Sequence, residues 1–132
     1  MSGALVLDSE GLAKAVRRDR EVHEWLTAAR DAGLPVVTSA AVPVEVIHPR
    51  INDAALKWTL SRLRVEPVTQ ALAQSAAALL RGAGLHGHKY AIDAMSCATA
   101  LAQQGRVTIL TSDVGDVGML TAEHPRVVAE KV

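Results

Sequence analysis

Aromatic residues are almost absent from this chain of 132 residues, which contains two tryptophans, one tyrosine and no phenylalanine. The core must therefore be built from alanine, valine and leucine, whose small side chains suit close packing of helices on a sheet. Base stacking on aromatic rings is also excluded as the main means of holding a nucleic acid.

Three further absences limit the classes of protein to consider. A lone cysteine, Cys97, excludes an intramolecular disulfide and a cysteine-cluster zinc site. No signal peptide and no apolar run of membrane-spanning length is present, so we expect a cytoplasmic protein without a membrane partner. No repeat, low-complexity tract or linker divides the sequence, which predicts a single domain over residues 1–132.

Charge is balanced, because 14 basic residues face 14 acidic residues and the formal net charge is zero. No global field would steer a nucleic acid, so such binding would need a local basic patch. The clearest patch is Lys14, Arg17 and Arg18, which is usually a solvated helix face but is also the best candidate for phosphate contacts in a nuclease.

Hydrophobic patterning predicts strands that alternate with helices. The expected strands are residues 4–7, 35–38, 107–111 and 127–129; Pro67 makes 65–68 either an edge strand or a connector. The expected helices are 11–20, a segment that ends at Gly33, one that carries Glu45 with Ser39 or Val42 as its cap, 51–62, a helix capped by Thr69, and 90–104. This order predicts an α/β fold with a mostly parallel sheet of four to five strands, covered by helices on both faces.

Carboxylates stand at the ends of the expected strands. Asp113 follows the strand 107–111, and Asp116 lies three residues later, on the same side of a following helical turn. Asp113 could instead simply cap that helix, because aspartate is a preferred N-cap residue. Right-handed crossovers bring the carboxyl ends of parallel strands to one edge, where such sheets bind their ligands.

Four acids share an uncharged, apolar setting: Asp8, Glu45, Asp93 and Asp113. If they converge at one sheet edge they repel each other strongly, and a bound cation would relieve that repulsion. Oxygen ligands favour Mg²⁺ or Mn²⁺. The chemistry that fits is metal-assisted hydrolysis of a phosphodiester bond; the alternative is that two or more of these acids are helix caps or partners of arginines.

The motifs resemble the PIN-domain family along the whole chain. They are Leu-Asp-Ser at 7–9, Glu45 in an apolar helix start, Ile-Asp-Ala at 92–94 before a small-residue helix, and Leu-Thr-Ser-Asp-x-x-Asp at 110–116. Within that family the chain looks most like the toxin ribonucleases of VapBC-type toxin–antitoxin pairs. The chain departs from the family pattern at Pro43 and in having few aromatic residues.

The resemblance implies a three-layer α/β/α fold and a Mg²⁺- or Mn²⁺-dependent endoribonuclease. It also implies a homodimer and a small antitoxin that occupies a groove beside the acids. Carried over by motif, Asp8, Glu45, Asp93 and Asp113 are the catalytic metal ligands, with Asp116 second to them. By the same reasoning Ser9, Thr111 and Ser112 are candidates for orienting the ligands or a water molecule.

Other chemistry-bearing residues have simpler interpretations. His86 and His88 are expected to be exposed loop histidines, and Cys97 a buried spacer in a small-residue helix. Trp58 could belong to the core or could anchor a surface that binds a dimer partner or an antitoxin, and its basic neighbours favour the surface.

Two other functions compete with the ribonuclease. A catalytically inert PIN-like module would bind RNA or protein without regard to divalent metal. A receiver-like phosphoacceptor domain would need an acidic pair after the first strand, but Asp8 is followed by Ser9.

Overall fold

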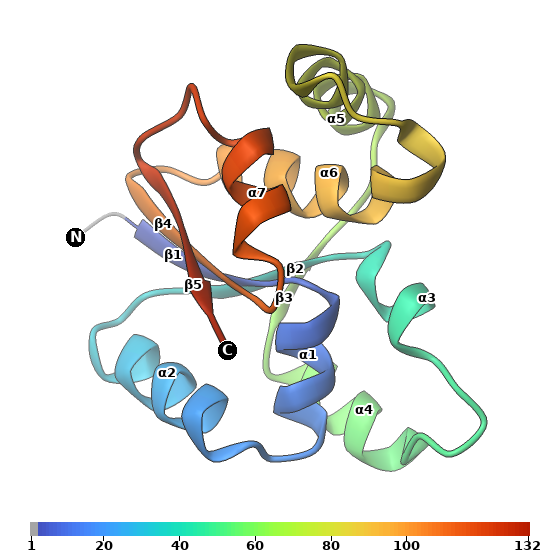
Figure 1. The fold of residues 1–132 in the computed structure, drawn as a ribbon. Coiled ribbons are helices and arrows are strands. Elements are labelled where there is room, and N and C mark those ends of the chain that lie inside the picture. Colours follow the sequence, from blue (N-terminus) through green and yellow to red (C-terminus); the bar gives the residue numbers. More distant parts are fainter. Residues whose placement is uncertain (1–2) are drawn as a thin grey trace.

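The apolar, β-branched runs form one five-stranded sheet in which every pairing is parallel. The structure, a computed structural model, describes residues 3–132 (Figure 1). The strand order is β3-β2-β1-β4-β5. The strands are β1 (Gly3–Leu7), β2 (Val36–Ser39), β3 (Arg64–Glu66), β4 (Arg106–Thr111) and β5 (Val127–Lys131). Their carboxyl ends therefore share one edge, as the sequence predicted.

Helices cover both faces of the sheet, which confirms the three-layer α/β/α architecture (Figure 1). One face carries α1 (Ser9–Val16), α2 (Arg20–Asp31) and α4 (Asp53–Ser61). The other carries α5 (Gln70–Ala83), α6 (Gly87–Leu101) and α7 (Val114–Leu120). The short helix α3 (Val42–Val46) follows β2 at the carboxyl edge.

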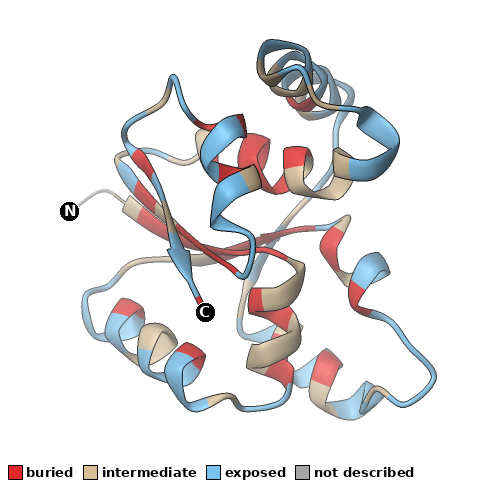
Figure 2. Cartoon of the chain, viewed as in Figure 1, coloured by how far each residue is buried: buried red, intermediate tan, exposed pale blue. Residues whose placement is uncertain are grey.

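Two separate apolar cores lie above and below the sheet. Alternate residues of β1 serve them in turn: Val6 packs with the alanines of α6, while Leu5 and Leu7 pack with Leu12 of α1. Figure 2 shows the buried residues concentrated in the central strands and on the inner sides of the helices. Small side chains on α6 let that helix lie close to the sheet, as the composition led us to expect.

Several predicted helix boundaries were wrong, each for a local reason. The first helix spans residues 9–16 and not 11–20, because Asp8 caps it and Arg18 has a left-handed backbone with φ 60°. The N-cap of α3 is Ala41, so neither Ser39 nor Val42 fills that role. Helix α6 begins at Gly87, three residues earlier than predicted, and it ends at Leu101.

The remaining boundaries agree closely with the pattern. Thr69 caps α5, and Gly84 ends it with a left-handed φ of 68°. The segment before Pro67 forms the edge strand β3, paired in parallel with β2. Within residues 3–132, none of the helices combines the length and apolar character needed to cross a bilayer.

Candidate active site

Two adjacent strands deliver Asp8 and Asp113 to the carboxyl edge of the sheet. Leu7 at the end of β1 pairs with Leu110 of β4, so the residues that follow them lie close together. Asp8 is 6% exposed, and its Oδ1 accepts a 2.9 Å hydrogen bond from the Gly11 amide at the start of α1. Burial raises the pKa of Asp8, and hydrogen bonds from the Gly11 amide and the Thr111 side chain partly offset that rise.

Thr111 links this carboxylate to the next one. Its hydroxyl oxygen accepts a 2.9 Å hydrogen bond from the Asp113 amide, and its side chain lies close enough to Asp8 to lower the pKa of that carboxyl group. Asp113 in turn caps α7, and its Oδ1 accepts from the Asp116 amide at 3.4 Å. Thr111 is fully buried, and its hydroxyl holds the backbone at Asp113.

Three carboxylates come together at this edge from two helices. Asp93 of α6, Asp113 at the N-cap of α7 and Asp116 within α7 each offer an oxygen, and these oxygens all lie within 4.8 Å of one another. The pKa of Asp93 rises to about 6, first because the side chain is partly buried and then because Asp8, Glu45, Asp113 and Asp116 are all negative. The five acids therefore share one electrostatic site.

Asp116 belongs to this group more directly than its predicted second rank suggested. A side-chain hydrogen bond with Asp113 is the main cause that raises the pKa of Asp116, and the charge of Lys89 acts in the opposite direction. One oxygen of each carboxylate lies within 4.8 Å of the other, so a single cation could contact both.

Asp8 and Glu45 lie outside the group of three, although both raise the pKa of Asp93. Glu45 is exposed, contrary to what its apolar surroundings suggested, because α3 buries Val42 and Val46 instead. One carboxylate oxygen of Asp8 already accepts a hydrogen bond from the Gly11 amide at the start of α1. Both carboxylates thus act on the three-acid group through their negative charge.

The predicted orienting and basic residues have different positions. The Ser9 hydroxyl is buried without a hydrogen-bond partner among residues 3–132, whereas Ser112 is exposed. Lys14 lies in the last turn of α1, away from Asp8 at its start, and Arg17 pairs with Glu10 at 3.4 Å. Arg18 lines a groove on the α1, α2 and α4 side of the sheet.

Residues with simpler interpretations mostly behave as predicted. Cys97 is fully buried, and burial raises the pKa of its thiol to about 12, which makes it a poor nucleophile. Trp58 is 59% exposed, in agreement with a surface position. His86 and His88 are exposed, but His86 is the N-cap of α6 and His88 lies inside that helix, not in a loop.

Sequence reasoning missed Lys89, which lies close enough to affect Asp116. The sequence pattern predicts a helix start at residue 90, which leaves Lys89 in the preceding loop. With the true helix start, the four-residue spacing from Lys89 to Asp93 would have placed both residues on one side of α6.

A family comparison agrees with this arrangement of acids. The PIN-domain family model matches residues 5–115, which covers most of the chain. The chain belongs to the PIN-domain family. The matched region contains Asp8, Glu45, Asp93 and Asp113, and it stops one residue before Asp116.

Solved structures share the fold of this PIN domain. A chain of VapBC2 from Rickettsia felis, solved bound to a DNA fragment from the promoter, has a TM-score of 0.69 at 15% identity and covers 98% of both chains. A chain of a toxin–antitoxin complex from Klebsiella pneumoniae has a TM-score of 0.68 at 22% identity, over 98% of this chain and 100% of that one. A chain of FitAB bound to the IR36 DNA fragment has a TM-score of 0.61 at 21% identity, over 96% of this chain and 94% of that one. No curated protein matches the chain.

The donor set of this PIN domain fits a hard divalent cation. All three grouped ligand atoms are carboxylate oxygens, and within residues 3–132 no histidine or cysteine joins them. Oxygen-only sites suit Mg²⁺ and Mn²⁺, whereas zinc prefers nitrogen and sulfur. Two additional negative charges, on Asp8 and Glu45, would strengthen the attraction for a cation.

Proposed function

We propose that residues 1–132 act as one PIN domain that hydrolyses RNA phosphodiester bonds with Mg²⁺ or Mn²⁺, as the toxin of a type II toxin–antitoxin pair. The observation that carries the proposal is the group of three carboxylates, Asp93, Asp113 and Asp116, within the field of Asp8 and Glu45. Family membership supports a nuclease. The toxin assignment rests on structural similarity to chains of VapBC2 and of a toxin–antitoxin complex.

Each part of the site has a chemical task in this proposal. Asp93, Asp113 and Asp116 would hold the cation, and Asp8 and Glu45 would complete its surroundings. A divalent cation held there would supply Lewis-acid chemistry, which lowers the pKa of a water molecule and stabilises the charge on the leaving oxygen. Thr111 would hold the Asp113 backbone in place through the hydrogen bond that its hydroxyl accepts from the Asp113 amide.

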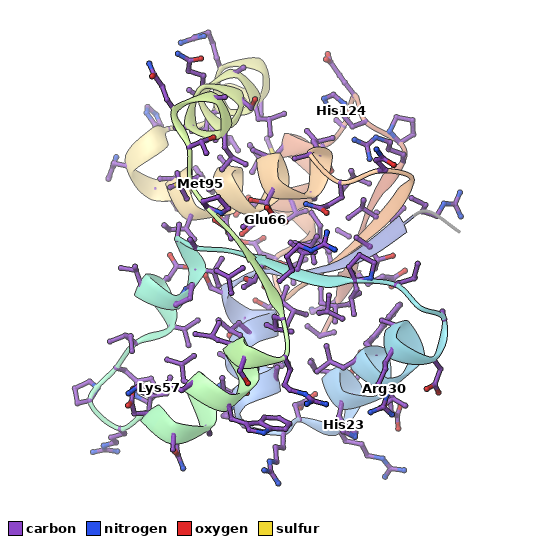
Figure 3. All side chains as sticks on the ribbon, turned by 180° about the vertical axis from the view of Figure 1, so that it is seen from behind. His23, Arg30, Lys57, Glu66, Met95 and His124 are labelled. Carbon is purple, nitrogen blue, oxygen red and sulfur yellow. The ribbon has the colours of Figure 1, made fainter. Side chains whose placement is uncertain are left out.

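An antitoxin partner is part of the proposal, and the site we propose for it is a groove on the face of the sheet that carries α2 and α4, in place of the groove beside the acids that the resemblance implies. This groove of about 800 Å³ lies beside α2 and α4, away from the carboxylates, and its floor includes the apolar residues Leu26, Leu34 and Leu63. Figure 3 labels His23 and Arg30 on the α2 side. One acid and four arginines line it: Asp19, Arg18, Arg30, Arg62 and Arg64. An acidic, amphipathic antitoxin segment would complement these charges and change the fluorescence of Trp58 in the groove wall.

A homodimer is also proposed, with α3 as its contact surface. Val44 is 76% exposed and Ile47 is 56% exposed on and just after this short helix. Apolar side chains exposed together mark contact surfaces. Val44→Asp should convert a dimer into a monomer in light scattering, whereas an unchanged mass would exclude this surface.

Thermal unfolding with and without Mn²⁺ tests the metal site. A ligand that binds only the native state raises its stability by about 2.7 kcal/mol at 100 times its Kd. We expect Mn²⁺ to raise the melting temperature of the wild type, and Asp93→Asn to abolish the rise. Asp31→Asn, which changes an exposed acid on α2, is the matched control and should keep it.

Cleavage of unstructured RNA then tests the activity. Asp8→Asn and Asp93→Asn should abolish cleavage while the proteins stay folded, as judged by circular dichroism. Full activity in either variant would overturn the proposal. RNA binding that ignores divalent metal, without cleavage, would establish the inert binding module instead.

A further inference from the structure

Lys89 and Tyr90 lie one helical turn before Asp93 on α6. Residues three and four positions apart are neighbours on a helix, so both side chains lie on the same side of α6 as the carboxylate of Asp93. Lys89 is exposed and Tyr90 is half-buried. The Lys89 ammonium lies 5.1 Å from the centre of the Tyr90 ring, so the two side chains form one contiguous surface.

The Lys89 ammonium has no carboxylate within 4.0 Å among residues 3–132. By contrast, Lys57 pairs with Asp53 at 3.0 Å and Arg17 pairs with Glu10 at 3.4 Å. Asp93, one of the three grouped acids, nevertheless lies only four residues further along α6, which is one helical turn away. Lys89 therefore places an unpaired positive charge at the rim of an acidic site.

Such a charge has an evident use beside these acids. A polyanion that approaches five carboxylates is repelled, and a cation at the rim both offsets that repulsion and fixes the position of the backbone. Tyr90 is also the one aromatic residue on this side of the sheet, because Trp25 and Trp58 belong to α2 and α4 on the opposite face. A tyrosine ring can stack on an unpaired base.

We propose that Lys89 and Tyr90 form a substrate-contacting strip beside the carboxylates, which rests on the ribonuclease function proposed above. The Lys89 ammonium contacts a phosphate next to the one that is cleaved, and the Tyr90 ring stacks on a neighbouring unpaired base. The strip positions the strand and takes no part in bond cleavage. One ring and one lysine supply this grip, in keeping with a chain that has few aromatic residues.

Salt dependence of binding tests the Lys89 contact. Binding of an unstructured oligoribonucleotide would be measured from 50 to 200 mM salt in an Asp8→Asn background, which prevents cleavage and leaves the three-acid group intact. Each phosphate contact to single-stranded nucleic acid contributes about 0.7 to the slope of log K against log salt. Lys89→Gln should make this negative slope shallower by about 0.7. Lys57→Gln, an exposed lysine on α4, is the control and should leave it unchanged.

Affinity at fixed salt tests the Tyr90 contact. Loss of one stacked ring costs about 1–3 kcal/mol, so Tyr90→Leu should weaken binding roughly 5- to 150-fold without changing the salt slope. Tyr90→Phe keeps the ring and should bind like the parent. Circular dichroism of each variant establishes that α6 is intact.

The outcomes separate this inference from the proposed function. If the wild type cleaves RNA but Lys89→Gln keeps the parental slope and Tyr90→Leu binds like Tyr90→Phe, the strip is wrong and the ribonuclease stands. If the wild type neither cleaves nor binds RNA, the ribonuclease function fails and the strip fails with it.

Discussion

At the scale of single residues, Asp8 has two roles that can be separated by substitution. Its carboxylate caps α1 through the Gly11 amide and also contributes negative charge to the site. Asparagine keeps a cap acceptor but removes the charge, whereas alanine removes both. Asp8→Asn should therefore be more stable than Asp8→Ala by about 1 kcal/mol in urea unfolding, while both lose cleavage. Equal stabilities would show that the cap contributes nothing.

The raised pKa of Asp93 leads to a second prediction for a single residue, which concerns how the stability of the metal-free protein depends on pH. Burial and the neighbouring acids raise this pKa from 3.8 to about 6, so the folded state binds the proton more tightly than the unfolded state. The resulting stability is fully present below pH 3.8 and is lost as pH rises through about 6. Without metal, the free energy of unfolding should therefore fall over this interval.

Asp93→Asn tests this linkage because it cannot ionise. A shift of this size corresponds to about 3 kcal/mol at most, and solvent screening of a half-exposed side chain lowers that to about 1–2 kcal/mol. The free energy of unfolding would be measured in urea with a chelator present, at pH 4 and at pH 8. Between these two pH values it should fall by about 1–2 kcal/mol less in Asp93→Asn than in the wild type. Asp31→Asn, with its exposed carboxylate, should follow the wild type. Identical pH profiles for Asp93→Asn and the wild type would contradict the assignment.

At the scale of elements, the position of α1 depends on the absence of a side chain at Gly11. A Cβ at this position would lie 2.8 Å from the Leu110 carbonyl oxygen of β4, which also accepts a hydrogen bond from the Asp8 amide. The helix could avoid the clash only by moving away from the strand. That movement would carry Asp8 with it.

Gly11→Ala should therefore destabilise the protein, although alanine favours helices. Overpacking costs about 1–3 kcal/mol and outweighs a helix-propensity gain of about 1 kcal/mol. Gly82→Ala is the matched control, because Gly82 lies in α5 with no heavy atom within 4 Å of the added Cβ. Thermal unfolding should show a lower melting temperature for Gly11→Ala and an equal or higher one for Gly82→Ala. A stabilised Gly11→Ala variant would show that α1 adjusts freely.

At the scale of the whole molecule, the fold was predictable because its rules are global. Alternating strands and helices with right-handed crossovers require one carboxyl edge, and that rule brought Asp8 near Asp113 without any knowledge of side chains. The three-residue spacing predicted that Asp116 lies beside Asp113, but the position of Glu45 outside the inner group was not predictable. That position depends on the bounds of α3, which buries Val42 and Val46 and leaves Glu45 exposed. Periodicity locates such helix ends only to within a few residues.

Charge balance over the whole chain leads to the last prediction, on how far the RNA extends. With a formal net charge of zero, salt dependence must come from individual cations near the strand. Lys14 lies six residues beyond Asp8, about 9 Å along α1, and Arg17 already pairs with Glu10. If the RNA follows α1, Lys14→Gln should make the negative slope of log K against log salt shallower by about 0.7. Arg17→Gln should change that slope by less. An unchanged slope for Lys14→Gln would confine the RNA to the carboxyl edge, because a phosphate held by Lys14 must release counterions when it binds.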